Sequence, residues 1–235
     1  MGGAHTGHRP GMADQDGPAT VVLDVDGTLL DSSYHHAIAW ARAFEHVGAP
    51  VPVWRIHRAI GMGGDRLVGA VAGDEVEEEH GDEVRERWEK EYDALIDETR
   101  LLPGAKELLR SIRDLGLGVA LASSSIPKHA EHAFDLLDVG LLADTATTAE
   151  DAEESKPDPE LVDEALERLG SRSGCVVGDS VYDVEAAQRA GVPAYGVLTG
   201  GYGRAELLDA GARGVYEDLD DLRSHLDEWL PVGRP

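Results

Sequence analysis

The chain has 235 residues, which is long enough for one core domain and a smaller inserted one. Its formal charge of −25 argues against nucleic acid or an anionic membrane as a partner, because both are bound mainly through Lys and Arg. Cys175 is the only cysteine, and no apolar run approaches the roughly 18 residues of a membrane helix, so we expect a cytoplasmic protein without an intrachain disulfide.

The first hundred residues change character twice. Residues 1–18 are rich in Gly, His and Pro and lack the apolar run of a secretory signal, so they predict a disordered tail. The apolar run Thr20–Leu23 then predicts a buried strand that ends on Asp24. Residues 32–101 contain no convincing strand and predict a helical domain inserted after it. Its helices are predicted at Ser33–His46 and at residues 54–60, 65–71 and 75–97.

From residue 102 onward, short apolar runs alternate with helical patterns. This alternation predicts parallel βαβ units, and therefore an α/β fold whose doubly wound parallel sheet is covered by helices on both faces. We assign residues 19–31 and 102–235 to this core. The predicted strands are residues 117–122, 174–177 and 192–197 and Gly214–Tyr216; the predicted helices include residues 105–115 and 160–169, the latter with Asp158 as its N-cap.

The strongest chemical signal is the run Asp24-Val25-Asp26-Gly27-Thr28, directly after the first strand. The carboxyl ends of parallel strands line the ligand crevice of such a sheet, so Asp24 emerges where binding is expected. Two carboxylates this close suit a nucleophile and a general acid/base, and they form an oxygen-rich seat for Mg²⁺. An ordinary Asp-rich turn is the plainer explanation of this run taken alone.

Two further candidates follow later segments of the core. Ser123 closes a predicted strand and can donate a hydrogen bond to a phosphoryl oxygen, helped by backbone N–H groups of Ser124 and Ser125; turn and cap material is the alternative. Lys156 stands alone among acidic residues and can offset carboxylate and phosphate charge, whereas a solvated loop lysine is the default interpretation.

The last motif is Gly178-Asp179-Ser180-Val181-Tyr182-Asp183, after another predicted strand. Asp179 is a candidate metal ligand, and Asp183 lies one helical turn further on, where it can support Asp179 or Lys156. A helix N-cap would explain Asp179 without any metal. The common placement of these residues, at or just beyond carboxyl strand ends on one edge of one sheet, favours a functional site.

These four motifs, in this order, resemble those of the haloacid dehalogenase superfamily. The resemblance extends from residue 20 to the end, and it implies a Rossmann-like core with the helical insert as a mobile cap. By position, Asp24 would attack phosphorus to form an aspartyl-phosphate, while Asp26 would protonate the leaving oxygen and then activate water. Ser123 and Lys156 would hold the phosphoryl group. Mg²⁺ would be held by the side chains of Asp24 and Asp179 and by the main-chain carbonyl of Asp26, with Thr28 and Asp183 in support.

The resemblance predicts a Mg²⁺-dependent phosphatase that acts on a small phosphorylated metabolite. Asp26 argues against the dehalogenase and phosphonate-cleaving branches, which lack this second aspartate. A sugar-phosphate mutase of the β-phosphoglucomutase type is the closer rival, since His36 matches a cap histidine of those enzymes. Mutases carry a basic residue in the cap loop, where this chain has Gly64 beside Gly63, and Arg66 is displaced. A non-catalytic binding protein is a third possibility.

Three features carry weaker expectations. Gly200-Gly201-Tyr202-Gly203 is explained by a flexible turn, and His129 and His132 by a solvated helix face. The acidic charge fits either genomic base composition or adaptation to high salt. The sequence leaves the substrate open, and it is equally compatible with a monomer or a homodimer.

Overall fold

The computed structural model describes residues 19–171 and 173–230. The tail predicted at residues 1–18 lies outside the described residues. Within them, none of the helices combines the length and the apolar character that a membrane crossing requires.

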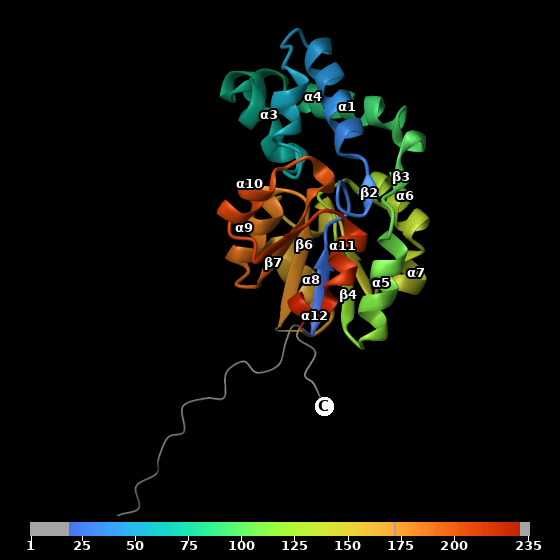
Figure 1. The fold of residues 1–235 in the computed structure, drawn as a ribbon. Coiled ribbons are helices and arrows are strands. Elements are labelled where there is room, and N and C mark those ends of the chain that lie inside the picture. The colour runs from blue at the N-terminus through green and yellow to red at the C-terminus, as the bar shows by residue number, and fades with distance from the viewer. Residues whose placement is uncertain (1–18, 172, 231–235) are drawn as a thin grey trace, which may run out of the picture.

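The core is one parallel sheet of six strands in the order β5-β4-β1-β6-β7-β8 (Figure 1). Side chains alternate between its two faces, so that Val21 and Leu23 enter one hydrophobic cluster while Val22 enters the other. This confirms the predicted doubly wound parallel sheet. The strands are β1 (Thr20–Leu23), β4 (Gly118–Ala122), β5 (Thr145–Thr147), β6 (Gly174–Gly178), β7 (Ala194–Val197) and β8 (Gly214–Tyr216).

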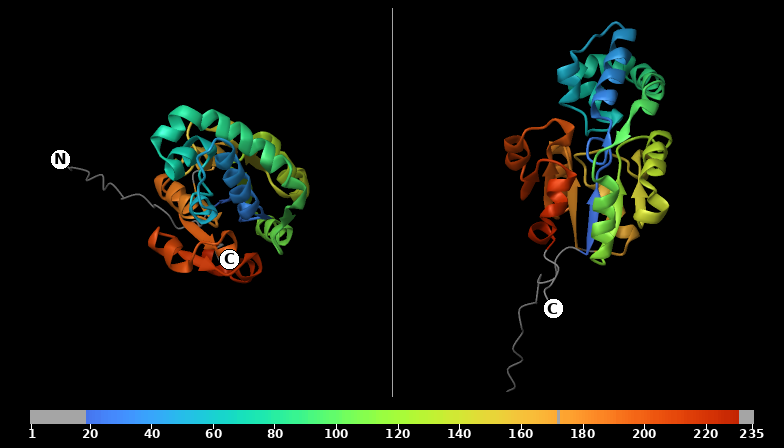
Figure 2. Two further views of the ribbon diagram at one scale, coloured as in Figure 1. Left: turned by 90° about the horizontal axis from the view of Figure 1, so that it is seen from above. Right: turned by 45° about the vertical axis from the view of Figure 1, so that its right-hand side comes forward.

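Helices cover both faces of the sheet, as the right-hand view of Figure 2 shows. One face packs against α5 (Ala105–Asp114), α6 (Pro127–Leu137), α7 (Val139–Leu142), α11 (Leu219–Ser224) and α12 (Leu226–Trp229). The other face packs against α8 (Glu160–Arg168), α9 (Val181–Arg189) and α10 (Arg204–Asp209). Burial on both faces explains why the central strands are continuously apolar instead of alternating with polar residues.

Four helices form a separate layer above the carboxyl end of the sheet (Figures 1 and 2). They are α1 (Ser33–His46), α2 (Val53–His57), α3 (Gly64–Ala72) and α4 (Asp74–Asp93), and they enclose their own hydrophobic cluster. The chain enters and leaves this helical layer through a short antiparallel pair, β2 (Leu30–Asp31) with β3 (Arg100–Leu101). The layer is therefore tied to the core by two adjacent backbone strands.

Several element boundaries differ from the sequence-based prediction. Strand β5 was not predicted, and α6 was expected only as a helix carrying His129 and His132, without bounds. The long helix ends at Asp93, with a separate 3-10 turn at Ile96–Glu98. Asp158 is not the N-cap of α8: the helix begins at Glu160 and its N-cap is Pro159, although the Asp158 carboxylate accepts a 3.3 Å hydrogen bond from the N–H of Glu160.

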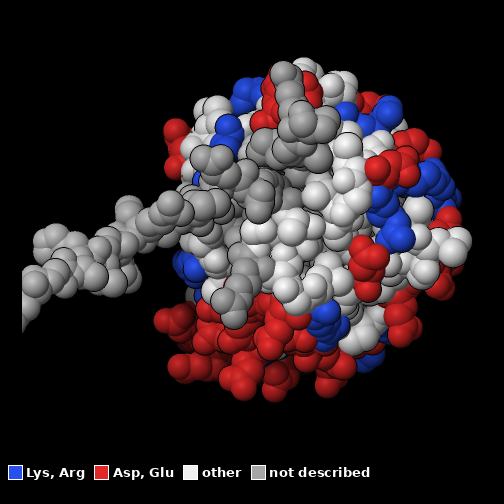
Figure 3. Space-filling view, turned by 90° about the horizontal axis from the view of Figure 1, so that it is seen from below, with Lys and Arg blue, Asp and Glu red and all other residues white. Residues whose placement is uncertain are grey.

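The acidic charge is unevenly distributed over the surface. Seen from the end opposite the helical layer, Asp and Glu side chains crowd along one side of the molecule (Figure 3). One acidic groove of about 460 Å³ runs between α8 and the 3-10 turn Ala149–Asp151. Its charged lining is entirely carboxylate: Glu150, Asp151, Glu153, Glu160, Asp163, Glu164 and Glu167.

Candidate functional site

The predicted site residues converge at the point where the strand order reverses. Strand β1 lies between β4 and β6, and the chain builds the sheet outward first on the β4 side and then on the β6 side. Asp24 directly follows β1, Ser123 follows β4 and Asp179 follows β6, so all three lie at carboxyl strand ends. This switch point is where open α/β sheets bind their ligands.

A glycine turn brings the first motif against Asp179. Gly27 has a φ of +85°, and a Cβ there would lie 2.6 Å from Asp179 Oδ2. Only glycine fits both the left-handed backbone and this close approach. The turn also places the Thr28 hydroxyl 3.1 Å from Asp24 Oδ2 and 2.8 Å from Asp179 Oδ1, so Thr28 links the two carboxylates.

Lys156 is the basic side chain at the centre of this group, and only 2% of it is exposed. Its ammonium group forms a buried ion pair with Asp24 and a second one, of 2.8 Å, with Asp183. It also donates a 3.1 Å hydrogen bond to the carbonyl oxygen of Ala122. Burial opposes its charge, but Asp183 and Asp24 outweigh burial and raise the pKa of Lys156 above its usual value.

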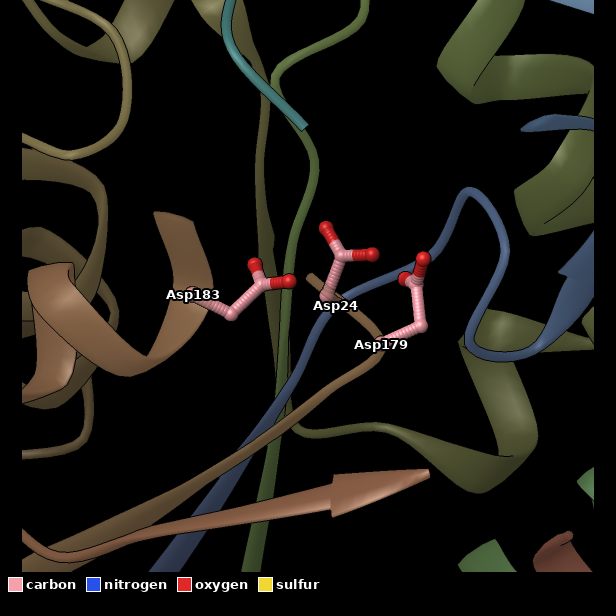
Figure 4. Close-up of side chains that lie close together, drawn as sticks. All are labelled: Asp24, Asp179 and Asp183. Carbon is pink, nitrogen blue, oxygen red and sulfur yellow. The ribbon is translucent and has the colours of Figure 1, made fainter. Parts of the chain in front are cut away.

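Asp24, Asp179 and Asp183 each turn a carboxylate oxygen toward the others, within 4.8 Å (Figure 4). Burial raises the pKa of Asp24 to about 7, although Lys156 acts in the opposite direction. Burial and the neighbouring Asp24 raise the pKa of Asp179 well above its usual range. Three crowded carboxylates with one lysine leave an excess of negative charge, and such an all-oxygen set suits a hard divalent cation.

Asp183 is held by the start of α9. Its carboxylate accepts hydrogen bonds from the Ser180 N–H and from the Ser180 hydroxyl, at 3.0 and 2.6 Å, while Ser180 Oγ caps the Asp183 N–H. The second carboxylate oxygen of Asp183 is the one that meets Lys156. Asp183 thus connects the helix terminus to the lysine, whereas Ser180, not Asp179, is the N-cap of α9.

Asp26 faces a different environment from Asp24. One carboxylate oxygen accepts a 2.6 Å hydrogen bond from the Ser32 hydroxyl and lies 3.2 Å from His36 Nε2. The other accepts a 2.8 Å bond from the Ser125 hydroxyl and lies 3.5 Å from Ser123 Oγ. Burial would raise its pKa, but His36, Ser32 and Ser125 hold the pKa of Asp26 below its usual range.

His36 reaches Asp26 from the helical layer. Its ring stacks on Tyr92 with centroids 3.8 Å apart, and Trp88 lies behind it at 5.7 Å. This aromatic support fixes the imidazole over the core carboxylate. The contact therefore joins α1 and α4 of the layer to the first motif of the core.

The loop before α3 closes over the site from the same layer. A candidate catalytic cavity of about 40 Å³ is lined by Asp24 and Asp26 together with Gly64 and Ser124. Gly63 donates its N–H to Ser155 Oγ at 3.0 Å, directly beside Lys156 in the chain. Among the described residues, Arg66 does not line this cavity, because its guanidinium pairs with Glu154 of the core.

Other contributors were not identified from the sequence. The Ser32 hydroxyl binds Asp26, and so does the Ser125 hydroxyl, whereas the sequence pointed only to the backbone N–H of Ser125. Trp88 lines the candidate catalytic cavity from α4. Gly200 was attributed to a flexible turn, yet a Cβ there would overlap the Asp179 carboxylate, so this turn is closely packed. The assignment of His129 to a solvated face is wrong, since it is 3% exposed and lies 3.0 Å from Asp93 of α4.

The chain is similar to known proteins over most of its length. The family model of haloacid dehalogenase-like hydrolases matches residues 18–191. The phosphoglycolate phosphatase of Pseudomonas putida is 28% identical over 89% of this chain and 79% of that protein. The validoxylamine A 7'-phosphate phosphatase of Streptomyces hygroscopicus subsp. limoneus is 30% identical over 90% of this chain and 97% of that protein. A solved hydrolase from Pseudomonas syringae matches with a TM-score of 0.84 at 34% identity, over 89% of this chain and 98% of that one.

Proposed function

The chain belongs to the haloacid dehalogenase-like hydrolase family, and on this premise we propose that it is a Mg²⁺-dependent phosphatase of a small phosphorylated metabolite, with Asp24 as the nucleophile. The observation that carries the proposal is the position of Asp24. It lies at the switch point of the sheet, between the ammonium group of Lys156 and the carboxylate of Asp179. The names of the relatives support phosphatase activity, although they differ in the substrate.

The charges around Asp24 suit phosphoryl transfer, which depends mainly on positioning and on neutralisation of charge. Bound beside Asp24 and Asp179, Mg²⁺ would supply positive charge that favours their ionised forms and screens the incoming phosphate. Lys156 would neutralise the remaining charge and orient Asp24 for in-line attack. Ser123 and Ser124, at the end of β4, would donate hydrogen bonds to the phosphoryl oxygens.

Asp26 would serve as the general acid and then the general base. In attack by Asp24, a bond forms from Asp24 to phosphorus, the ester oxygen leaves, and Asp26 gives it a proton. In the second step Asp26 takes a proton from water, which attacks phosphorus and regenerates Asp24. To act as a general acid, Asp26 must first be protonated, but its pKa in the free protein is low. The negative charge of an approaching phosphate dianion would raise this pKa and so favour the protonated form.

The helical layer α1–α4 would act as a cap that opens to admit substrate and closes for reaction. Its loop before α3 contacts Ser155, and its His36 contacts Asp26, so opening would break contacts on both sides of the catalytic cavity. Closure would exclude bulk water during the first step.

The phosphatase proposal is favoured over a mutase by the cap loop. A mutase must bind a second phosphate group, and this binding requires an unpaired basic side chain near the cavity. Gly64 stands at the cavity without a side chain, and Arg66 is engaged by Glu154. His36 is accounted for by its contact with Asp26, which either activity would use.

Hydrolysis of p-nitrophenyl phosphate tests the proposal directly. We expect turnover in Mg²⁺, loss of turnover in excess chelator and recovery when Mg²⁺ is restored. The Asp24→Asn variant should be inactive in all three conditions. Full activity in excess chelator, or an active Asp24→Asn variant, would overturn the mechanism. Conversion of a hexose 1-phosphate to its 6-isomer faster than phosphate release would favour the mutase instead.

A further inference from the structure

A second cavity of about 340 Å³ adjoins the catalytic cavity, between α4 and the core segment 149–155. Three residues line both cavities: Gly64, Trp88 and Ser124. When the phosphate of a substrate lies at Asp24, the rest of the substrate can therefore extend into this side cavity. The inference that follows rests on the proposed phosphatase function, because it concerns the leaving group of the same reaction.

The size of the side cavity indicates a leaving group of several carbons. Its volume equals that of roughly ten water molecules and lies near the lower end of small-molecule sites, about 300–1,000 Å³. A two-carbon acid such as glycolate would leave most of this space to water. A sugar-sized alcohol would fill a much larger share of it.

The charges that line the side cavity are predominantly negative. Four carboxylates line it, against one basic side chain, Arg85; they are Asp65, Glu86, Glu89 and Glu153. Arg85 is already neutralised by Glu77 and Asp82, each at 2.9 Å. It offers no free charge to a second anionic group of the substrate.

Two of the four carboxylates lie near a basic side chain that partly offsets their negative charge, and the other two do not. Glu89 lies 3.3 Å from Lys128, and Asp65 lies 3.9 Å from Arg66. Within the described residues, Glu86 and Glu153 have no basic side chain at ion-pair distance. The side cavity therefore repels a carboxylate or a second phosphate and tolerates or attracts a cation.

Two of the residues that line both cavities, Trp88 and Ser124, carry uncharged hydrogen-bonding groups without a partner among the described residues. Trp88 is 8% exposed, and its indole Nε1 is buried without a hydrogen-bond partner in the described part of the chain. The hydroxyl oxygen of Ser124 is likewise buried and has no hydrogen-bond partner among the described residues. Buried polar groups without partners are uncommon in folded proteins, and hydroxyl groups of a bound ligand would satisfy both.

We propose that the side cavity receives the leaving group, and that the substrate is the phosphate monoester of a hydroxyl-rich alcohol without a second negative charge. A sugar or polyol phosphate, neutral or bearing an amine beyond the ester, has this chemistry. Its hydroxyl groups meet Trp88 and Ser124, and its lack of a second anion avoids Glu86 and Glu153. Phosphorylated carboxylic acids and bisphosphates are excluded as good substrates.

Matched phosphate esters test the proposal by kcat/KM. Sorbitol 6-phosphate and 6-phosphogluconate have the same linear six-carbon backbone. At the carbon farthest from the phosphate, the first carries a hydroxymethyl group and the second a carboxylate. We expect kcat/KM to be at least about tenfold higher for sorbitol 6-phosphate, which corresponds to about 1.4 kcal/mol. In the second pair, glucosamine 6-phosphate should equal or exceed glucose 6-phosphate. The difference within the first pair should shrink in 1 M KCl.

Two double variants test whether the preference for sorbitol 6-phosphate over 6-phosphogluconate depends on the charges of the side cavity. Glu86→Gln with Glu153→Gln removes the two uncompensated charges, so the preference for sorbitol 6-phosphate should fall to about threefold or less. Glu78→Gln with Glu79→Gln makes the same charge change on exposed positions of α4 outside the described cavity lining, and should leave the preference unchanged.

The outcomes separate this proposal from the proposed function. Equal or faster hydrolysis of 6-phosphogluconate or 2-phosphoglycolate would overturn the substrate class, while the phosphatase function would stand. The same holds if p-nitrophenyl phosphate is hydrolysed but none of the hexose derivatives is. Absence of any hydrolysis, p-nitrophenyl phosphate included, would overturn the phosphatase function itself.

Discussion

Asp24 and Asp26 are separated by one residue, yet the pKa of Asp24 is raised above the usual value for aspartate and that of Asp26 is lowered below it. Burial raises the pKa of Asp24 to about 7, whereas three donors from Ser32, His36 and Ser125 keep the pKa of Asp26 low. Their neighbours differ: Asp24 is buried between Lys156 and two other carboxylates, whereas Asp26 faces hydroxyl groups and an imidazole. Such a contrast between paired acids is the usual basis for a division of catalytic roles.

Substitution of each aspartate should separate these roles. Asp24→Asn removes the attacking oxygen, so no phosphoenzyme can form. Asp26→Asn keeps the shape but cannot take a proton from water, so the second step should slow by about 10²–10⁴-fold. Mixed with a donor that has a good leaving group, this variant should accumulate one phosphoryl group, visible by intact mass. Peptide mapping should place it on Asp24; a label on Ser123, or equal turnover by both variants, would show that the roles are assigned wrongly.

Metal binding should depend on pH through the same carboxylates. Because the pKa of Asp24 is about 7 and that of Asp179 is also raised, protons compete with the cation below neutrality. Mg²⁺ should raise the melting temperature by mass action, and the increase should be larger at pH 7.5 than at pH 5. Differential scanning fluorimetry with Mg²⁺ and with chelator measures it. Asp179→Asn should lose most of the increase; an increase independent of pH would contradict the raised pKa values.

At the scale of elements, the contact between α3 and the segment around Ser155 connects the helical layer to the lysine loop. The Gly63 N–H meets Ser155 Oγ at 3.0 Å, and the Ser155 N–H lies 3.3 Å from Asp65 Oδ2. A Cβ on Gly63 would lie 2.7 Å from Ser155 Oγ. The approach of the two elements thus depends on the absence of a side chain at this position.

Gly63→Ala should therefore weaken catalysis more than stability. The added methyl group would push α3 away from Ser155, and we expect kcat/KM to fall by about tenfold, with a change of only a few degrees in melting temperature. Gly69→Ala, within α3, is the matched control, because its Cβ would meet nothing closer than 3.8 Å. It should keep full activity and gain up to about 1 kcal/mol of stability. Equal kinetics for the two variants would refute a role for this contact.

The sequence predicts the core of the site because that core depends on local patterns. Asp24, Ser123 and Asp179 each follow an apolar run, and parallel strands bring such ends together, so their meeting follows from topology. Strand β5 escaped prediction because Thr145–Thr147 is only three residues long and lies at the sheet edge. Its pattern has too few apolar residues to stand out.

Contacts across the two layers could not be predicted in the same way. The hydrogen bonds from Ser32 and His36 to Asp26 depend on how the insert folds over the sheet, which no local pattern determines. The burial of His129 against Asp93, and the junction at Trp88, have the same origin. Local patterns in the sequence indicate the carboxylates that are proposed to carry the reaction, while the partners of these carboxylates are apparent only in the packed structure.

At the scale of the whole molecule, the charge of −25 is a continuous source of self-repulsion. On α8, burial and, after it, repulsion from the neighbouring Asp158 raise the pKa of Asp163. The basic partners available there are few: Arg168 pairs with both Asp151 and Glu164. The acidic groove beside α8 is therefore where repulsion between carboxylates should be most easily relieved.

Salt should stabilise the protein by screening this repulsion. The Debye length falls from about 30 Å at 0.01 M to about 3 Å at 1 M, so the melting temperature should rise from low salt to molar KCl. Asp163→Asn with Glu167→Gln removes two groove carboxylates that have no ion-pair partner among the described residues. This variant should be more stable than the unmodified chain at low salt, and the gain should vanish in molar KCl. Glu164→Gln, which breaks the 2.7 Å pair with Arg168, should bring no such gain. A melting temperature that stays flat across the salt range would instead favour genomic base composition as the origin of the charge.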